Sequence, residues 1–475
     1  MKFTEKTFNS WFNKDSDITT RKLVKFGKQI FVCFVDCMVD KKLIADSIIS
    51  PILQIKNDIS TQKIFNRLST YNASIIKSKQ DAISAVLSGG VILFVEGSQS
   101  AIFASVADYK TRSITEPPTS QVTKGPREGF VEDININLSL IRKRLKSPNL
   151  AVKNIVVGKQ TQTKVAIVYL SDIADKKLAQ DIEKKLSGYQ IDGIIDSYYI
   201  TTILEDGKLK LLRRVGNSEK PDVVTSRLLE GRIAIVVDGS PIVLTIPFLL
   251  IEDLQSPEDY YQIEARTSFL RIIRLVGLVL GVLLPGIYVA LQSYQYKILP
   301  INFLVTLLSS IEGISLPPLL EILFVLFLFD ILAEASARMP KLLGMALSII
   351  GALVLGETTV QAGIISPPSI VVVAISSIML FIIPDDVPQI GLLRILFTVV
   401  GGVAGFYGML MSFIMASTYL VSADGYGVPL LSPYAPTNKH DKQDAILKTS
   451  LLNMKKRPQT IAKKNKTRLG DNNNE

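Results

Sequence analysis

The stretch from Leu275 to Tyr294, LVGLVLGVLLPGIYVALQSY, contains twenty residues and no charged side chain. A helix of about 20 apolar residues is long enough to cross the roughly 30 Å hydrocarbon layer of a bilayer. Arg266, Arg271 and Arg274 come shortly before it. Because positive residues tend to stay on the cytosolic side, this segment is predicted to start in the cytosol. The sequence therefore indicates an integral membrane protein.

Charge divides the 475-residue chain, whose formal net charge is +10, into three zones. Charged residues are frequent before this segment, almost absent from 275 to 423, and mainly basic after residue 437. We predict a multi-spanning membrane domain over 264–436 and a basic cytosolic tail over 437–475 that could rest on anionic lipid. The chain starts without the apolar core of a signal peptide, so both termini are expected in the cytosol.

The number of membrane crossings stays open from the sequence. There are about six apolar segments, of which two or three, including 298–311, are shorter than a crossing needs. Two cytosolic termini require an even number. Six crossings place Arg338 and Lys341 outside, against the charge rule, whereas four place them inside but require hairpins or re-entrant pieces.

Two pairs of similar segments indicate that the soluble region is a duplicated α/β structure. Asp40 and Asp175 each begin an Asp-Lys-Lys-Leu sequence after an apolar, β-rich run, at the start of an expected helix. Residues 89–98 and 231–240 both end in an acid-Gly-Ser turn that is typical of a β-hairpin. We predict α/β subdomain 1 over 1–115, a connecting loop and helix over 116–149, and α/β subdomain 2 over 150–263.

Composition argues against metal or catalytic chemistry. One histidine, His440, and two cysteines, Cys33 and Cys37, do not supply the ligands of a structural zinc site. No glycine-rich nucleotide-binding motif occurs, and no nucleophile and base form a recognisable pattern. We expect no metal, no cofactor and no enzymatic activity. Nucleic acid is not expected either, because the basic cluster from Arg142 to Lys146 has no aromatic residues between its charges.

Four acidic residues lie in or beside the apolar segments and form the candidate ion path: Glu321, Asp330, Glu334 and Glu357. A carboxylate near the middle of a membrane costs roughly 2.5–3.5 kcal/mol on insertion scales. Asp330 and Glu334 are four apart and share one helix face, whereas Glu321 falls nearly opposite. One interpretation is a ring of acids that lines a cation path. The other is residues at helix ends, where water reaches them.

Glycines indicate close helix packing in the last apolar segment. Gly401 and Gly405 form a Gly-x-x-x-Gly pattern within a run of 29 residues without charge, Ile395 to Ala423. Small residues let membrane helices approach closely, which supports packing within the chain or between copies of it.

A distinctive block, Gly-Pro-Arg-Glu-Gly-Phe-Val-Glu-Asp, runs from Gly125 to Asp133 after Glu116-Pro117, and a helix with a basic end is expected to follow it. On this block and on later motifs the chain resembles the A subunit of the GerA-type spore germination receptors. The later motifs are Arg338-Met339-Pro340, Gly356 to Gly363, Ser366-Pro367, Gly427-Val428-Pro429 and Ser432-Pro433. The family usually has Gly-Gln-Ala-Ala-Val where this chain has Gly-Glu-Thr-Thr-Val around Glu357.

The helix after this block has two interpretations, a solvated connection or an interface that joins subdomains or subunits. The candidate interface residues of the family motif are Gly125, Pro126, Arg127, Glu128, Gly129, Phe130, Glu132, Asp133, Arg142 and Arg144.

The resemblance implies a location in the inner membrane of bacterial spores. It implies two partners, a transporter-like B subunit that binds the nutrient and a lipoprotein C subunit. It also implies an oligomer, expected to be a pentamer, that acts as a nutrient-gated channel and releases monovalent cations. Two alternatives remain: a scaffold that conducts nothing, and a secondary transporter, which the paired prolines Pro317-Pro318 and Pro367-Pro368 would suit.

Overall fold

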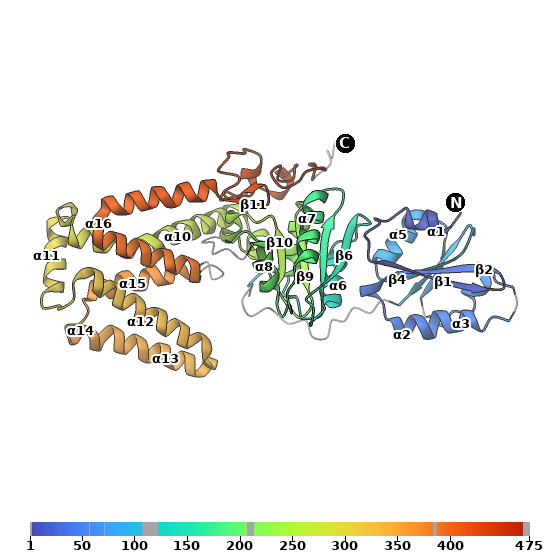
Figure 1. Cartoon of the computed structure of the whole chain (residues 1–475), viewed down its shortest axis with the longest axis horizontal. Coiled ribbons are helices and arrows are strands. Elements are labelled where there is room, and N and C mark those ends of the chain that lie inside the picture. The colour runs from blue at the N-terminus through green and yellow to red at the C-terminus, as the bar shows by residue number, and fades with distance from the viewer. Residues whose placement is uncertain are drawn as a thin grey trace.

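The computed structural model describes residues 2–468 except 57, 71, 107–121, 207–212 and 383–386. The molecule is elongated, with subdomain 1 at one end, subdomain 2 in the middle and a bundle of helices at the other end (Figure 1). The first described residues lie in subdomain 1, and the last described residues lie beside subdomain 2. Glu116 and Pro117 of the family motif lie outside the described residues.

Subdomain 1 is an antiparallel sheet covered by helices on both faces. Its strands run in the order β1-β2-β4-β5-β3: β1 (Ile18–Lys25), β2 (Lys28–Val35), β3 (Ala73–Ile76), β4 (Gly90–Val95) and β5 (Ala101–Ser105). Alternate residues of a strand point to opposite faces, so β2 buries Val32 on one side and Cys33 on the other. The short helices α2 (Lys41–Ile44), α3 (Ser50–Leu53) and α4 (Thr61–Phe65) cover the first face. The other face packs against α1 (Glu5–Asn9) and α5 (Lys79–Leu87).

Subdomain 2 repeats this sheet. Its strands run in the order β6-β7-β9-β10-β8, which is the same order shifted by five: β6 (Leu150–Val157), β7 (Thr163–Leu170), β8 (Gly216–Ser218), β9 (Ile233–Val237) and β10 (Val243–Ile246). Helices α6 (Ile134–Arg144) and α9 (Pro221–Leu229) cover one face. Helices α7 (Lys176–Gly188) and α8 (Ser197–Leu204) cover the other. The two sheets confirm the predicted pair of related α/β subdomains.

The paired segments that indicated the duplication occupy equivalent positions in the two subdomains. The Asp40 carboxylate accepts a hydrogen bond from the backbone N–H of Lys42 at the start of α2, and Asp175 accepts one from Lys177 at the start of α7. An aspartate at this position satisfies N–H groups that have no partner within the helix. Gly97 and Gly239, which follow β4 and β9, both have positive φ, +79° and +86°.

The described part of residues 264–422 is helical, as expected for a polytopic membrane domain. Two 3₁₀ turns, η3 (Leu250–Leu254) and η4 (Pro257–Tyr261), lead from subdomain 2 into the bundle. The helices are α10 (Glu264–Ser293), α11 (Ile301–Ile311), α12 (Pro318–Arg338), α13 (Lys341–Leu353), α14 (Thr359–Gln361), α15 (Pro367–Leu380) and α16 (Val387–Ser422). A π-helical turn (Val354–Thr358) joins α13 to α14. In the described part of the chain, three helical stretches are long and apolar enough to cross a membrane: 264–293, 343–361 and 389–422.

Helix α16 is bent back on itself. Gly405 has φ +62° and ψ −159°, a conformation that is essentially restricted to glycine. Figure 1 shows the two arms, 387–404 and 406–422, both extending from this bend toward subdomain 2. The Tyr294 hydroxyl lies 3.0 and 2.9 Å from the carbonyl oxygens of Gly402 and Val403, so these carbonyls have a donor beside them at the bend. The last apolar run is therefore two helical arms rather than one.

The chain makes six passes through the bundle, one of the two counts considered from the sequence, but over different segments. In Figure 1, α10 leads away from subdomain 2 and α11 lies across the far end. The later segments run alternately toward and away from subdomain 2: α12, α13, α15 and the two arms of α16. The segment 298–311 therefore makes no pass, and 395–423 belongs to two. The turn between α12 and α13, with Arg338 and Lys341, lies at the end nearer to subdomain 2.

The basic tail is folded onto subdomain 2. It follows the hairpin of β11 (Asp424–Gly425) and β12 (Val428–Pro429) and contains short 3₁₀ turns (Asp441–Gln443 and Leu451–Asn453). Ala462 is fully buried in the same cluster as α6 and α9, and the Arg457 Nε donates to the Leu229 carbonyl at 2.8 Å. The structure buries Met454, Ile461 and Ala462 and leaves Leu447, Leu451 and Leu452 exposed, so contact of the tail with anionic lipid stays a prediction.

Candidate functional site

Asp330 pairs with an arginine from another helix. Its Oδ1 accepts a hydrogen bond from the Arg394 Nη2 at 2.8 Å, and the Arg394 Nη1 donates to the Ser377 Oγ at 3.1 Å. These three residues belong to α12, α16 and α15, so one guanidinium joins three helices. The Arg394 side chain is only 3% exposed, whereas the Asp330 side chain is 49% exposed. A cavity of about 350 Å³ lies beside the pair.

Glu334 lies one helical turn beyond Asp330 on the outside of the bundle. Its carboxylate accepts from the Arg338 Nε at 2.6 Å, and both side chains are more than half exposed. Residues four apart lie on one helix face. Asp330, Glu334 and Arg338 therefore form a polar stripe along α12, and we call it the α12 stripe.

Glu321 has a different environment from the α12 stripe. It is buried, and its Oε1 accepts hydrogen bonds from the backbone N–H and the hydroxyl of Ser366 at 2.6 and 2.7 Å. Ser366 directly precedes α15, so Glu321 of α12 satisfies the start of a neighbouring helix. The positive end of the α15 dipole favours a carboxylate there. Glu321 thus holds two helices together in this conformation.

Glu357 lies in the π-helical turn after α13. It is exposed, and its carboxylate accepts from the Gln361 side chain at 3.3 Å. Within one chain, the structure therefore brings Asp330 and Glu334 together on the α12 stripe but leaves Glu321 and Glu357 in separate surroundings.

The two candidate packing glycines have different positions. A Cβ on Gly401 would lie 2.5 Å from the carbonyl oxygen of Gly286, so α10 and the first arm of α16 touch backbone to backbone there. Gly405 forms the bend of α16. A Cβ on Gly405 would also lie 3.1–3.2 Å from the side chains of Gln295 and Tyr294.

Arg142 of the family motif joins the two subdomains. Its Nε and Nη2 both donate to the Asp17 carboxylate, at the start of the subdomain 1 sheet, and its other bonds go to the carbonyls of Ser147 and Leu150 at 3.0 and 3.2 Å. The Arg142 and Asp17 side chains are 1% and 7% exposed. In this structure the helix after the motif therefore contacts subdomain 1 through Arg142.

The rest of the family motif follows the surface of subdomain 2. Gly125 has φ +116° and lies against the Tyr261 ring, and Lys220 donates to the Pro126 carbonyl at 2.9 Å. Arg127 and Gly129 lie in the extended run, and Asp133 caps α6. Glu128 pairs with Lys143 and Arg144. The Phe130 N–H donates to the Glu219 carbonyl, and the Glu132 carbonyl accepts from the Gly239 N–H.

The sequence did not reveal an ion cluster where the soluble region meets the membrane bundle. Asp259 of η4 is buried and accepts from the Arg271 Nε and the Arg274 Nη1, each at 2.9 Å, both from the first turns of α10. Asp444 of the tail accepts from the Arg271 Nη1 at 2.9 Å. The Lys448 Nζ, also from the tail, donates to the Asp259 carbonyl at 2.6 Å. This cluster fixes the base of α10 to both subdomain 2 and the tail.

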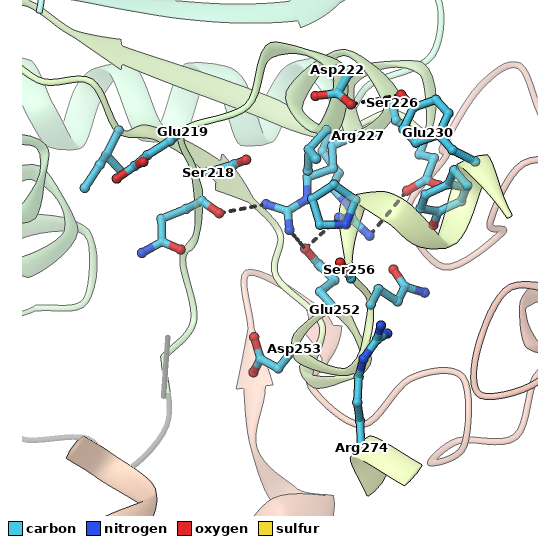
Figure 2. Close-up of a pocket in the computed structure, with 18 of the residues that line it drawn as sticks. Ser218, Glu219, Asp222, Ser226, Arg227, Glu230, Glu252, Asp253, Ser256 and Arg274 are labelled. Carbon is cyan, nitrogen blue, oxygen red and sulfur yellow. Dashed lines mark hydrogen bonds and ion pairs between the residues drawn. The ribbon is translucent and has the colours of Figure 1, made fainter. Parts of the chain in front are cut away.

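Beside this cluster, a cavity of about 650 Å³ opens between α9, η3, η4 and the start of α10 (Figure 2). Figure 2 shows the Arg227 guanidinium directed at Glu252, with Arg274 at the lower edge. Glu252 pairs with Arg227 and Arg232, each at 2.9 Å, and burial raises the pKa of Glu230. Five arginines and five acidic residues line the cavity, so its lining has no net charge. Among the described residues no group of side chains is placed to hold a metal ion.

These features define a class: a polytopic membrane protein whose helical bundle is fixed to a soluble region made of two related α/β subdomains. A family model described as the Bacillus/Clostridium GerA spore germination protein matches residues 6–460. The chain belongs to this GerA spore germination protein family, which confirms the resemblance found from the sequence. Members of this family are receptor proteins rather than enzymes.

Individual relatives cover nearly the whole chain. Spore germination protein KA of Bacillus subtilis is 35% identical over 465 residues, 96% of this chain and 85% of the relative. Spore germination protein A1 of the same organism is 30% identical over 448 residues, 93% of this chain and 92% of the relative. A crystal structure of the N-terminal domain of the A subunit of the Bacillus megaterium spore germinant receptor GerK3 is 28% identical. It covers 50% of this chain and 91% of that domain, with a TM-score of 0.39.

Proposed function

We propose that this chain is the A subunit of a spore germinant receptor and forms, as a homo-oligomer, a nutrient-gated channel for monovalent cations. Its partners in this proposal are a transporter-like B subunit and a lipoprotein C subunit, and its location is the inner membrane of the spore. A pentamer is the oligomer that the family resemblance implies. The observation that carries the proposal is the α12 stripe.

The α12 stripe places two exposed acids on the surface of this bundle. Asp330 and Glu334 are 49% and 64% exposed in the single chain. The adjacent surface is apolar, with exposed Leu343 and Ile349 on α13. An ionised carboxylate in contact with lipid is unfavourable, by up to roughly 2.5–3.5 kcal/mol at mid-membrane, so water or another polypeptide is expected to cover this stripe. Copies of the chain arranged around a shared axis would place these acids along an aqueous path that favours cations.

The direction of the helices supports cytosolic termini. With the soluble region in the cytosol, the six passes place Arg338 and Lys341 on the cytosolic side, as the charge rule favours. Single cysteines in a Cys33→Ala/Cys37→Ala background test this topology. A reagent that cannot cross membranes, applied from outside, should label Gln361→Cys and should reach Met339→Cys only after permeabilisation. The reverse pattern would show the opposite orientation.

Potassium efflux tests the channel. Vesicles that contain this chain with its B and C partners are loaded with K⁺ and exposed to a panel of single amino acids, sugars and nucleosides. We expect efflux with at least one nutrient, and reduced efflux from an assembled Asp330→Asn/Glu334→Gln variant. Glu312→Gln, which removes an exposed acid outside the stripe, is the matched control.

Three other outcomes would contradict the channel or its assigned ion path. Unchanged conductance and selectivity in the double variant would reject the α12 stripe as the ion path. An assembled complex that binds nutrient and releases no K⁺ would favour the scaffold. Saturable movement of a substrate coupled to an ion would favour the transporter.

A further inference from the structure

Arg394 is a buried cation whose only ionic partner among the described residues is a half-exposed acid of the α12 stripe. Its side chain donates to Asp330 and to Ser377, and its Nε is buried without a hydrogen-bond partner in the described residues. The pair lies in the half of the bundle nearer to subdomain 2, because Arg394 comes seven residues after the start of α16, about 10 Å along the helix. The sequence analysis noted Arg394 only as the charge before an apolar run.

Arg394 makes one contact within the bundle and one at the edge of the cavity. Ser377 of α15 holds one end of the guanidinium from within the bundle, and both residues are buried. Asp330 of α12 holds the other end from the edge of the cavity, and Arg394 supplies its one hydrogen bond among the described residues. A displacement of α12 relative to α15 and α16 would therefore break the Asp330 contact first and leave Arg394 bound to Ser377.

The pairing also changes what Asp330 can do. A carboxylate attracts cations through its uncompensated negative charge, and a guanidinium at hydrogen-bonding distance cancels most of that charge. The conformation described here thus contains the acid of the α12 stripe in a neutralised form. The adjoining cavity, lined by Ala333, Ser336 and Leu380 among others, provides space for Asp330 to turn away from Arg394.

We propose that Arg394 is the residue that neutralises Asp330 in the closed channel, and that opening separates the two so that Asp330 faces the cation path. This inference rests on the proposed channel function. Arg394 acts as a positioning residue, since it controls the charge of Asp330 and does not itself contact the ion. The two members of the pair therefore have opposite roles: loss of Arg394 exposes an acid, and loss of Asp330 removes one.

Basal K⁺ efflux from loaded vesicles without nutrient tests this inference. Arg394→Gln should raise the basal rate about tenfold or more, because the closed state loses the cation that neutralises Asp330. Asp330→Asn should lower nutrient-triggered efflux. The double variant Asp330→Asn/Arg394→Gln should lose the raised basal rate of Arg394→Gln. Lys297→Gln, which removes an exposed cation outside the stripe, is the control and should change the basal rate little.

A purely structural role of the ion pair predicts a different result, because either single change would break the same contact and have the same effect. Equal behaviour of Arg394→Gln and Asp330→Asn would overturn the inference, as would an unchanged basal rate in Arg394→Gln with intact nutrient-triggered efflux. If Arg394→Gln does not assemble, Arg394→Lys serves instead. Lysine cannot reproduce the two-sided contact of the guanidinium, so a smaller rise is expected and no rise overturns the inference. Absence of nutrient-triggered efflux from the unmodified receptor would reject the channel itself.

Discussion

Replacement of Arg142 by methionine would remove the cation that connects the two subdomains. Methionine keeps much of the apolar volume but leaves the Asp17 carboxylate, which is only 7% exposed, without an opposite charge. It also leaves the carbonyls of Ser147 and Leu150 without their guanidinium donor. Breaking a buried ion pair from one side typically costs about 3–5 kcal/mol. For two subdomains that melt together, this corresponds to a midpoint lowered by roughly 6–20 °C.

The two cysteines provide an assay in the full chain. Cys33 and Cys37 are its only thiols, and both lie in subdomain 1. Burial raises the pKa of Cys33 to about 12, so the folded thiol is nearly unreactive at neutral pH. A thiol-reactive dye, followed during heating in detergent, therefore reports the unfolding of subdomain 1.

The double variant Asp17→Leu/Arg142→Met is the decisive comparison. Replacing both members of a buried ion pair with apolar side chains is often nearly neutral, so the double variant should melt several degrees above Arg142→Met. Because Cys37 lies 3.8 Å from Asp17, the comparison uses Cys33 in a Cys37→Ala background. If Arg142→Met melts within about 2 °C of the unmodified chain, or if the double variant is the less stable of the two, the ion pair does not connect the subdomains in the way described.

Three further predictions concern other parts of the fold. Gly405→Ala should destabilise the detergent-solubilised protein by about 1–3 kcal/mol, because this φ and ψ are strained for alanine. In the control Gly391→Ala the added Cβ meets open space, so the melting temperature should change little. Glu321→Gln should lower the melting temperature of the membrane domain, since two hydrogen bonds to a charged acceptor, worth about 1.5–3 kcal/mol each, are weakened. An unchanged melting curve would contradict this. Subdomain 1 should lose stability as the pH rises from about 9 toward 12, because unfolded Cys33 loses its proton near 9 while the folded thiol keeps it to about 12. Chemical denaturation between pH 8 and 10.5 should show this slope, and Cys33→Ala should reduce it.

The duplicated soluble region was predictable because its signals are local. Asp40 and Asp175 each cap the helix that they begin, and Gly97 and Gly239 each adopt the positive φ that their turns require. Such short-range preferences depend on a few neighbouring residues, so they can be recognised in a sequence before any tertiary contact is known.

The path of the membrane bundle was not predictable in the same way. The bend at Gly405 lies inside a run of 29 residues without charge, where hydropathy is uniform, and its polar contacts come from Tyr294 on α10. Asp330 and Arg394 are sixty-four residues apart and on different helices. Periodicity placed Asp330 on a helix face, but no local pattern indicates which distant residue will meet it.

The burial of Ala462 in subdomain 2 has a consequence for the order of events during biosynthesis. The ribosome makes residues 150–263 first, then the whole membrane bundle, and only then the segment that fills the α6 and α9 face. Until that moment, the apolar surface that Ala462 covers on the nascent subdomain is exposed while its own downstream helices insert. Subdomain 2 is therefore complete only after the membrane helices have been made and inserted. A chain that stalls in the membrane would remain open to proteolysis at subdomain 2.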